Sequence, residues 1–372
     1  MYLFVRSSTN PGPRVSRIAS FIKKKGGEVA YLSPIRTGDS VVDGIARVGD
    51  LGSFDYFDGK GYLPYLMFLA ITNIKTVKYL YKLRKQLKLV HFSDLESVLL
   101  GGILCKLLGI KYIYNIHDNF FQRYEFSSVL ANVLKNFESL YIKASEFTLV
   151  PEEFRGAAYP KYVQNKIYVF RNFPNFNVST ERMPFSDSTI KLFYGGWISP
   201  NRNLDLYLQV ASFLSQMDVT VKMLACGWGS AGYLSELQKR FYELGVEFEY
   251  LGQLKQTEAV DVLKSSDISI AYYSPDKIIN LYAASNKIPE ILGSNTILIT
   301  NSQTEVAKRI KDYHVSLQFQ DDVGETFNQL AGLIEDKNEL SKLILNARRY
   351  YITNYNPKKI DEALEAVLNG YV

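Results

Sequence analysis

Short runs rich in Val, Ile, Phe and Tyr alternate with longer helical patterns along the chain, and this alternation occurs twice. The first series stops near residue 172, and residues 172–188 carry prolines and many polar residues without periodicity, which is typical of a linker. Alternating strands and helices favour parallel sheets that are covered by helices on both faces. The sequence therefore predicts an α/β protein with two doubly wound domains, at residues 1–180 and 181–355. A last helical segment, residues 356–372, is expected to return to the first domain.

The length of 372 residues suits two domains of ordinary size. Expected strands lie at residues 2–6, 28–32, 88–92, 111–116, 147–151 and 167–170, and then at 190–194, 219–225, 247–251, 268–272 and 296–300. Expected helices lie at residues 15–25, 73–88, 95–108 and 129–143, and then at 204–215, 231–244, 257–264, 305–312, 339–351 and 357–368. Residues 39–69 read as helical and irregular segments that form either an acceptor surface or a packed insert.

Ligands of open parallel sheets bind beyond the carboxyl ends of the strands. Both series open with a strand, a turn that contains glycine or proline, and a helix; the two turns are Asn10–Pro13 and Gly195–Gly196. Two such sheets that face each other would form one deep cleft, and this cleft is the expected ligand site.

The most informative stretch is Ala283–Gly293, which precedes an apolar strand. Ser285 is a suitable N-cap, and Pro289 is tolerated in a first helical turn. The free N–H groups of that turn would attract a diphosphate, and Lys287 adds a positive charge. Glu290 comes one turn later, where it could accept hydrogen bonds from ribose hydroxyls. Each residue alone fits an ordinary capped helix, but the ordered set favours a nucleotide site.

This stretch resembles the nucleotide-sugar motif of glycosyltransferase family 4, in which a Ser-Pro-Asn-Lys-x-x-Glu run precedes a short helix. The resemblance implies a GT-B fold of two Rossmann-like domains and a retaining reaction. It makes Lys287 a phosphate-binding residue and assigns donor contacts to Ala284, Ser285, Asn286 and Glu290. Tyr282 stands where the family often has a second glutamate.

The resemblance continues in the segment Phe193–Leu204, which looks like the strand, glycine turn and cationic loop of the family. It assigns donor contacts to Gly195 and Gly196 and phosphate contact to Arg202, whereas Trp197 occupies a position that is usually arginine. Two later segments resemble a Gly-x-Gly turn and a base-contacting strand end, which adds the donor-binding glycines Gly227 and Gly252.

His117 and Asp118 end an expected strand of the first domain. Polar residues at the end of a buried strand cost desolvation and call for partners. A structural histidine is one explanation; the family resemblance instead places His117 over the donor sugar, with Asp118 either orienting it or capping the next helix. The early loop matches the glycine-rich first loop of the family by position, so Asn10, Gly12 and Arg14 are candidates for contact with the acceptor or the donor phosphate; a plain turn and cap is the alternative.

The net charge of +5 is too small and dispersed for a nucleic-acid-binding protein. Its clearest cluster is Lys23–Lys25 with Arg14 and Arg17 upstream, either a solvated helix end or a patch for an anionic membrane. The two cysteines read as free thiols in a reducing compartment, and no signal peptide or membrane span is evident, so a cytoplasmic or peripheral location is expected. The sequence contains no Asp-x-Asp motif and no Cys/His cluster that would bind a metal ion, and no cofactor is expected.

The sequence thus favours a metal-independent, retaining transfer of sugar from a nucleoside diphosphate sugar to a glycan or lipid-linked acceptor, in surface polysaccharide or glycolipid assembly. A nucleotide-sugar epimerase of the same fold is one alternative. A nucleotide-sugar-binding protein without catalysis is another, and Tyr282 and Trp197 make it plausible. An NAD dehydrogenase is a distant third, because neither half has a complete Gly-x-Gly-x-x-Gly fingerprint.

Overall fold

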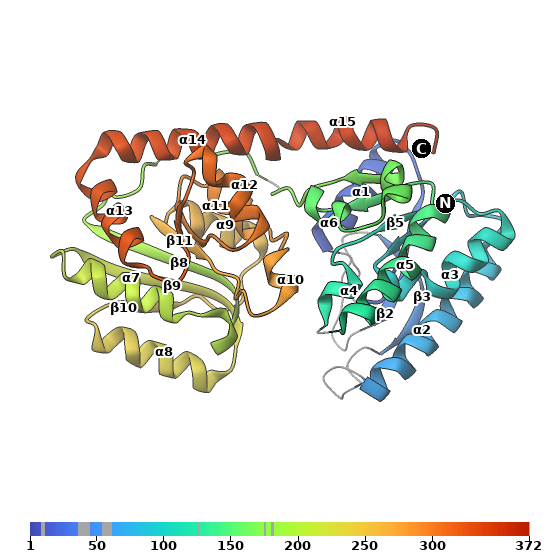
Figure 1. Cartoon of the computed structure of the whole chain (residues 1–372), viewed down its shortest axis with the longest axis horizontal. Coiled ribbons are helices and arrows are strands. Elements are labelled where there is room, and N and C mark those ends of the chain that lie inside the picture. Colours follow the sequence, from blue (N-terminus) through green and yellow to red (C-terminus); the bar gives the residue numbers. More distant parts are fainter. Residues whose placement is uncertain are drawn as a thin grey trace. The chain divides into compact units, whose positions relative to one another are not determined.

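The computed structural model describes residues 1–8, 12–35, 45–53, 62–124, 126–174, 176–179 and 182–371. The chain divides into two compact units. Unit 1 combines Met1–Asn172 with Lys358–Val372, and unit 2 is Phe173–Pro357. Each unit is built around one parallel sheet (Figure 1).

The sheet of unit 1 has seven parallel strands in the order β3-β2-β1-β4-β5-β6-β7. The strands are β1 (Tyr2–Arg6), β2 (Val29–Ile35), β3 (Ala46–Ser53), β4 (Leu89–Ser93), β5 (Tyr112–Asn115), β6 (Thr148–Val150) and β7 (Ile167–Val169). The helices are α1 (Gly12–Lys24), α2 (Tyr62–Leu83), α3 (Leu95–Leu108), α4 (Phe120–Arg123), α5 (Ser128–Ala144), α6 (Glu153–Ala157), η1 (Lys161–Lys166) and α15 (Pro357–Leu368).

The sheet of unit 2 has six parallel strands in the order β10-β9-β8-β11-β12-β13. The strands are β8 (Thr189–Ile198), β9 (Thr220–Gly229), β10 (Glu247–Tyr250), β11 (Ile268–Ala271), β12 (Ile297–Asn301) and β13 (Leu317–Phe319). The helices are η2 (Pro200–Arg202), α7 (Asp205–Ser215), α8 (Ala231–Glu243), α9 (Gln256–Lys264), α10 (Ile278–Leu281), α11 (Lys287–Gly293), α12 (Glu305–Ile310), η3 (Lys311–Tyr313), α13 (Gly324–Glu335) and α14 (Lys337–Tyr355).

Both sheets turn their strand order at the first strand of the unit. In unit 1 the chain moves outward from β1 to β3 and then crosses to β4 on the other side of β1. In unit 2 the same happens about β8, between β9 and β11. The helices that leave these neighbouring strands diverge to opposite faces, so a crevice opens at the carboxyl ends of β1/β4 and β8/β11.

The central strands are rich in apolar residues because helices cover both faces. Leu3, Val5, Val90 and Tyr114 are buried in unit 1, and Leu192, Ile268 and Ile299 are buried in unit 2. Such continuous Val, Ile and Leu runs are what parallel strands require. The prediction of two doubly wound α/β sheets is confirmed.

The differences lie at the sheet edges and in the turns. The edge strands β3 and β13 and helix α13 were not predicted, because ARVGDLGS in β3 is polar and glycine-rich and β13 has only three residues. Helix α2 begins and ends earlier than the expected 73–88. The residues expected as the turn Gly195–Gly196 lie inside β8, so that prediction is wrong.

Candidate functional site

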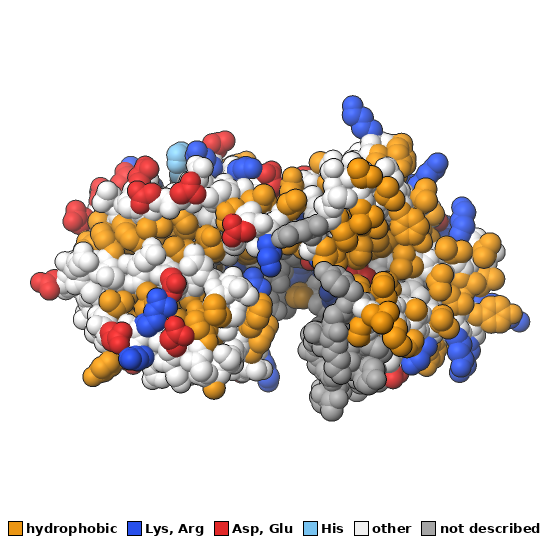
Figure 2. Space-filling model, turned by 60° about the horizontal axis from the view of Figure 1, so that its bottom comes forward, with side chains coloured by type: hydrophobic (Ala, Val, Ile, Leu, Met, Phe, Trp, Pro, Cys, Tyr) orange, Lys and Arg blue, Asp and Glu red, His pale blue; other side chains and the backbone are white. Residues whose placement is uncertain are grey.

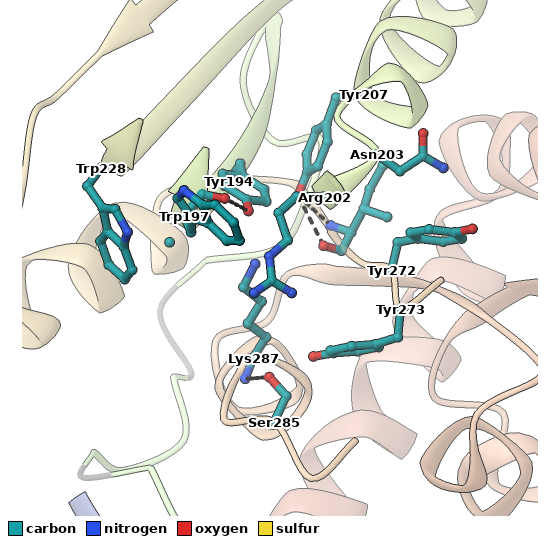
Figure 3. Close-up of a pocket in the computed structure, with 12 residues that line it drawn as sticks. Tyr194, Trp197, Arg202, Asn203, Tyr207, Trp228, Tyr272, Tyr273, Ser285 and Lys287 are labelled. Carbon is teal, nitrogen blue, oxygen red and sulfur yellow. Dashed lines mark hydrogen bonds between the residues drawn. The ribbon is translucent and has the colours of Figure 1, made fainter. Parts of the chain in front are cut away.

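A pocket of about 240 Å³ lies at the carboxyl ends of β8 and β11 in unit 2, the switch point of that sheet (Figure 3). Of the candidate residues, Gly196, Arg202, Ser285 and Lys287 line it. The other lining residues are mainly aromatic: Tyr194, Trp197, Tyr207, Trp228, Tyr272 and Tyr273, with Asn203 and Ile270. The structure therefore brings together residues from β8, η2, α7, β9, the end of β11 and the start of α11.

One wall of the pocket depends on a close pairing of two glycines. Strands β8 and β9 stay in register to their ends, so Gly196 lies opposite Gly227 and Trp197 opposite Trp228. The φ angles of Gly196 and Gly227 are 131° and 127°, which L side chains rarely adopt. A Cβ at Gly227 would lie 1.9 Å from the carbonyl oxygen of Gly196. Gly227 thus contributes backbone shape, and the predicted Gly-x-Gly turn is in fact a strand end.

The neighbouring residues hold this strand end in place. Gly227 N donates to Gly252 O at 2.8 Å, and the Tyr250 hydroxyl donates to Gly227 O at 2.6 Å. Gly252 has a φ of 73° and does not line the pocket. Gly195 is also a strand residue outside the lining. These glycines support the pocket wall from behind.

Two positive charges enter the same space (Figure 3). Lys287 Nζ lies 4.1 Å from the ring centroid of Tyr194, and the Arg202 guanidinium carbon lies 5.4 Å from that of Trp197. Neither cation forms an ion pair with any residue in the described part of the chain, and none of the described lining residues is acidic. Burial and the charge of Arg202 lower the pKa of Lys287 to about 8, against the weaker opposite influence of Glu290.

The start of α11 differs from the expected geometry. The helix begins at Lys287 with Asn286 at the N-cap, and Ser285 Oγ accepts a hydrogen bond from Lys287 N at 3.1 Å. Ser285 therefore stands one residue further out than predicted, while its hydroxyl still faces the pocket lining. Ala284 and Asn286 do not line the pocket.

Glu290 lies outside the lining as well. Its Oε1 accepts a hydrogen bond from Gln256 Nε2 at 2.8 Å, and burial raises its pKa. Gln256 begins α9, so Glu290 connects α11 to that helix.

Two lining tyrosines at the end of β11 were not predicted. Tyr272 and Tyr273 follow the strand directly, and this position is the signal that would have identified them. Burial raises the pKa of Tyr273 to about 12, so its hydroxyl stays a neutral donor.

A second pocket of about 240 Å³ lies at the carboxyl ends of β1 and β4 in unit 1. It is lined by His117 and Asp118 among the candidates, together with Asp94, Glu96, Arg6 and Arg123 and the α2 residues Tyr65, Phe68 and Leu69. Unlike the pocket of unit 2, it contains charges of both signs.

Asp94 holds His117 and was not predicted. The Asp94 carboxylate accepts from His117 N at 2.8 Å, and its second oxygen lies 3.2 Å from His117 Nδ1. Asp94 has a φ of 66°, a strained conformation for a residue with a side chain. Burial, helped by Arg14 and Arg6, lowers the pKa of His117 to about 4 although Asp94 opposes it. His117 is therefore a neutral imidazole with a fixed orientation.

Asp118 has a different partner from the one expected. Its Oδ1 pairs with Nη2 of the buried Arg155 at 2.9 Å, and Asn119 occupies the N-cap of α4. Asp118 thus neither orients His117 nor caps the helix, and both predictions are corrected. The reason is that the buried guanidinium of Arg155, 37 residues away in the sequence, needs a counter-charge.

The early loop is described only in part, because Asn10 lies outside the described residues. Gly12 has a φ of 77°, and a Cβ there would approach Arg6 Nη1 to 2.8 Å. Arg14 is buried, and its Nη2 donates to Ile116 O at 2.7 Å. Its guanidinium faces inward and is used by backbone carbonyls, so we no longer assign it to acceptor contact or to a surface patch.

Helix α1 ends in a weaker basic cluster than expected once Arg14 is removed. Lys25 pairs with Glu365 of α15 at 2.6 Å.

The described residues contain no group of three or more His, Cys, Asp or Glu side chains placed to hold a metal ion. Within them, no helix is both long and apolar enough to cross a membrane.

No protein-family model matches this chain, and no curated protein matches its sequence. Solved structures do match it. HepE from Anabaena in complex with UDP-glucose is 14% identical with a TM-score of 0.67, over 99% of each chain. Sucrose-phosphate synthase from Thermosynechococcus elongatus is 13% identical with a TM-score of 0.72, over 100% of this chain and 98% of the other. A glycosyltransferase from Rickettsia africae is 13% identical with a TM-score of 0.67, over 99% and 98%. Together with the two sheets, whose first six strands follow the same order, these matches show that the chain has the GT-B fold.

Proposed function

We propose that this protein transfers a sugar from a nucleoside diphosphate sugar to a glycan or lipid-linked acceptor. The observation that carries the proposal is the pair of cations in the unit 2 pocket, where Arg202 and Lys287 have no ionic partner in the described chain. Two like charges in a partly enclosed space raise each other's energy, and a diphosphate would relieve both. The HepE structures hold UDP and UDP-glucose, so UDP is the first nucleotide to test.

The aromatic walls suit the rest of such a donor. Trp197 and Trp228 lie beside the cations and are 41% and 57% exposed, although tryptophan side chains are on average largely buried. Flat apolar faces stack against bases and against the C–H faces of sugars. The hydroxyls of Ser285 and Tyr273 add neutral donors for oxygen atoms of the ligand.

In the proposed reaction, the bond between the anomeric carbon and the β-phosphate oxygen breaks, and its electron pair leaves with the diphosphate. An acceptor hydroxyl forms the new bond to the anomeric carbon and gives its proton to the oxygen of the departing diphosphate. Lys287 and Arg202 stabilise the charge that develops on the leaving group. Such stabilisation by fixed charges is usually the largest single contribution to catalysis. We further propose that this requires no metal ion and that the anomeric configuration is retained.

We propose that the pocket of unit 1 binds the acceptor. Neutral His117, fixed by Asp94, offers Nε2 to a sugar hydroxyl. Glu96 is held by Arg123 and by the Tyr65 hydroxyl, whose oxygen lies 3.1 Å from Glu96 Oε1. A cytoplasmic location, where nucleotide sugars are made, completes the proposal.

The test is nucleotide binding followed by turnover. We expect the melting temperature to rise with one nucleoside diphosphate, UDP first, and not with NAD, because a ligand that binds the native state stabilises it. With the matching nucleotide sugar and an acceptor, free nucleoside diphosphate should then appear without added metal. No shift with UDP, GDP, ADP or CMP would contradict the proposal. Binding without turnover would favour a binding protein, and an isomerised donor an epimerase.

The pKa of Lys287 predicts how UDP binding depends on pH. A bound diphosphate favours the charged ammonium, so the pKa of about 8 rises in the complex. Affinity is then full below that pKa and falls as the pH rises through it. The terminal phosphate of UDP loses its second proton at about pH 6, so its titration does not change the affinity in this pH range. We expect the Kd for UDP to rise about tenfold from about pH 7 to about pH 9.

Calorimetry at a series of pH values would measure this effect. The Lys287→Arg variant is the matched control, because arginine keeps its charge throughout the range while the rest of the site stays the same. A rise of equal size in both proteins would show that Lys287 is not the titrating group.

A further inference from the structure

Three neighbouring helices on one side of the sheet of unit 1 expose apolar side chains. Helices α2, α3 and α5 lie side by side, with α3 in contact with both neighbours (Figure 1). Their inner sides cover the sheet, and a surface helix normally carries polar residues on its outer side. Here the outward positions are large and apolar: Leu63, Leu66, Met67, Ile71, Ile74 and Tyr81 of α2, Leu100, Ile103, Leu107 and Leu108 of α3, and Val129, Leu130, Val133, Phe137 and Leu140 of α5.

The exposure is large for these side chains. Leu63, Leu107 and Val129, one from each helix, are 70%, 77% and 73% exposed. Figure 2 shows hydrophobic side chains gathered over this part of the molecule, with lysines and arginines at their margins. Contiguous apolar surface of this kind marks an interaction site, since scattered single residues would be the ordinary case. We call this surface, formed by the outer sides of α2, α3 and α5, the apolar layer.

The charges of the apolar layer have one sign. The three helices carry six lysines, Lys75, Lys78, Lys82, Lys106, Lys135 and Lys143, and no arginine. Their acidic residues are Glu96 and Glu138, and both are buried. The layer therefore presents apolar side chains and ammonium groups to its surroundings, with no exposed carboxylate of its own.

We propose that the apolar layer docks on the surface of a bilayer that contains anionic lipids. Leucine, isoleucine and phenylalanine would enter the boundary between headgroups and acyl chains, while the lysine stems extend to the phosphates. The charge pattern selects this occupant over a second copy of the chain, because two lysine-bearing layers would repel each other. Docking from one side also agrees with the absence of a membrane-spanning helix among the described residues.

Helix α2 links this surface to the pocket of unit 1. Its outward residues Leu63, Leu66 and Met67 belong to the apolar layer, whereas Tyr65, Phe68 and Leu69 line the pocket. The pocket of unit 1 and the apolar layer thus lie on different sides of the same helix, α2. This extension rests on the proposed function: a lipid-linked acceptor held in the bilayer would present its polar head beside α2.

The experiment is sedimentation of the full chain with vesicles. Wild type should bind vesicles that contain about one third phosphatidylglycerol, bind neutral phosphatidylcholine vesicles far less, and lose binding at high salt. A triple variant, Lys82→Gln with Lys106→Gln and Lys143→Gln, should weaken binding by roughly 100-fold, at about a fivefold factor for each lysine removed. A double variant, Leu107→Gln with Leu140→Gln, should weaken binding to both kinds of vesicle.

Matched controls keep the test specific. The triple variant Lys23→Gln, Lys24→Gln and Lys25→Gln removes the same charge from the end of α1 in the same unit, and should bind as wild type does. Tyr242→Gln, at a residue 82% exposed on α8, controls for loss of an apolar side chain. Melting temperatures of all variants should equal that of wild type, because every altered side chain is at the surface.

Three outcomes would overturn the proposal: no binding of wild type to anionic vesicles, equal loss in the α1 variant, or a concentration-dependent dimer in sedimentation velocity that the Leu107→Gln, Leu140→Gln variant abolishes. Vesicle binding is measured without nucleotide and UDP binding without vesicles, so the failure of this proposal and that of the proposed function are separate results.

Discussion

Replacing Lys287 by alanine is expected to lower the rate of sugar transfer by about 100- to 1000-fold, the usual cost of removing one fixed group that stabilises developing charge. The ammonium reaches the pocket across the Tyr194 ring, 4.1 Å from its centroid, and shares the space with Arg202. Alanine leaves Arg202 alone to balance a diphosphate. The loss should therefore appear in turnover and in UDP affinity together.

Stability should not fall in this variant. Burial lowers the pKa of Lys287, which means that the folded protein holds this charge at an energetic cost. Alanine removes the cost, so the melting temperature is expected to stay unchanged or to rise slightly. Lys277→Ala is the control, since Lys277 is exposed, lies close in sequence and does not line the pocket. Full transferase activity of the Lys287→Ala protein would refute the phosphate role of this residue.

Replacing Gly227 by alanine is expected to destabilise unit 2 by about 3 to 5 kcal/mol, as a buried clash adds to backbone strain. The new Cβ would lie 1.9 Å from the Gly196 carbonyl oxygen, and the φ of 127° is unfavourable for any side chain. Backbone on both strands must move to relieve the contact. Because Trp197 and Trp228 continue these strands, the pocket wall moves with them.

The two tryptophans give a direct readout of this variant. The chain has only two, and both belong to unit 2. Urea unfolding followed by tryptophan fluorescence therefore reports on unit 2. The control is Gly332→Ala, at an exposed position of α13 where a Cβ meets nothing within 4 Å; it should stabilise by about 0.5 to 1 kcal/mol, as alanine does in a helix. Equal midpoints for Gly227→Ala and wild type would show that the strand ends are not tightly paired.

The sequence predicts the central parts of the fold well because burial on both faces leaves a clear pattern. Tyr2–Arg6 and Leu95–Leu108 have the bounds that the pattern predicts. Edge strands such as β3 lack this pattern because one side has no neighbour and polar residues are tolerated there. In α3 nearly every residue is apolar, so periodicity alone gives no sign of which side faces solvent. The exposed stripe of that helix became visible only in three dimensions.

Asp94 illustrates the limit for the site. An aspartate directly before a helix ordinarily caps it. In the structure Asp94 makes no capping hydrogen bond and its carboxylate turns to His117 instead. That contact exists because β4 and β5 are neighbours in the sheet, which local sequence does not reveal. Lys287 and Arg202 were predictable because motif and strand end coincide there.

The path of the chain has a consequence for the order of folding during synthesis. Unit 2 is one uninterrupted stretch of sequence, whereas unit 1 is assembled from both ends. Tyr371 of the returning segment donates a hydrogen bond to Glu146 at 2.6 Å, and Glu365 pairs with Lys25. Since domains fold as they leave the ribosome, from the N-terminus onward, the unit that is translated first is the one that is finished last. Unit 2 can therefore complete its fold before α15, the last part of unit 1, has been translated.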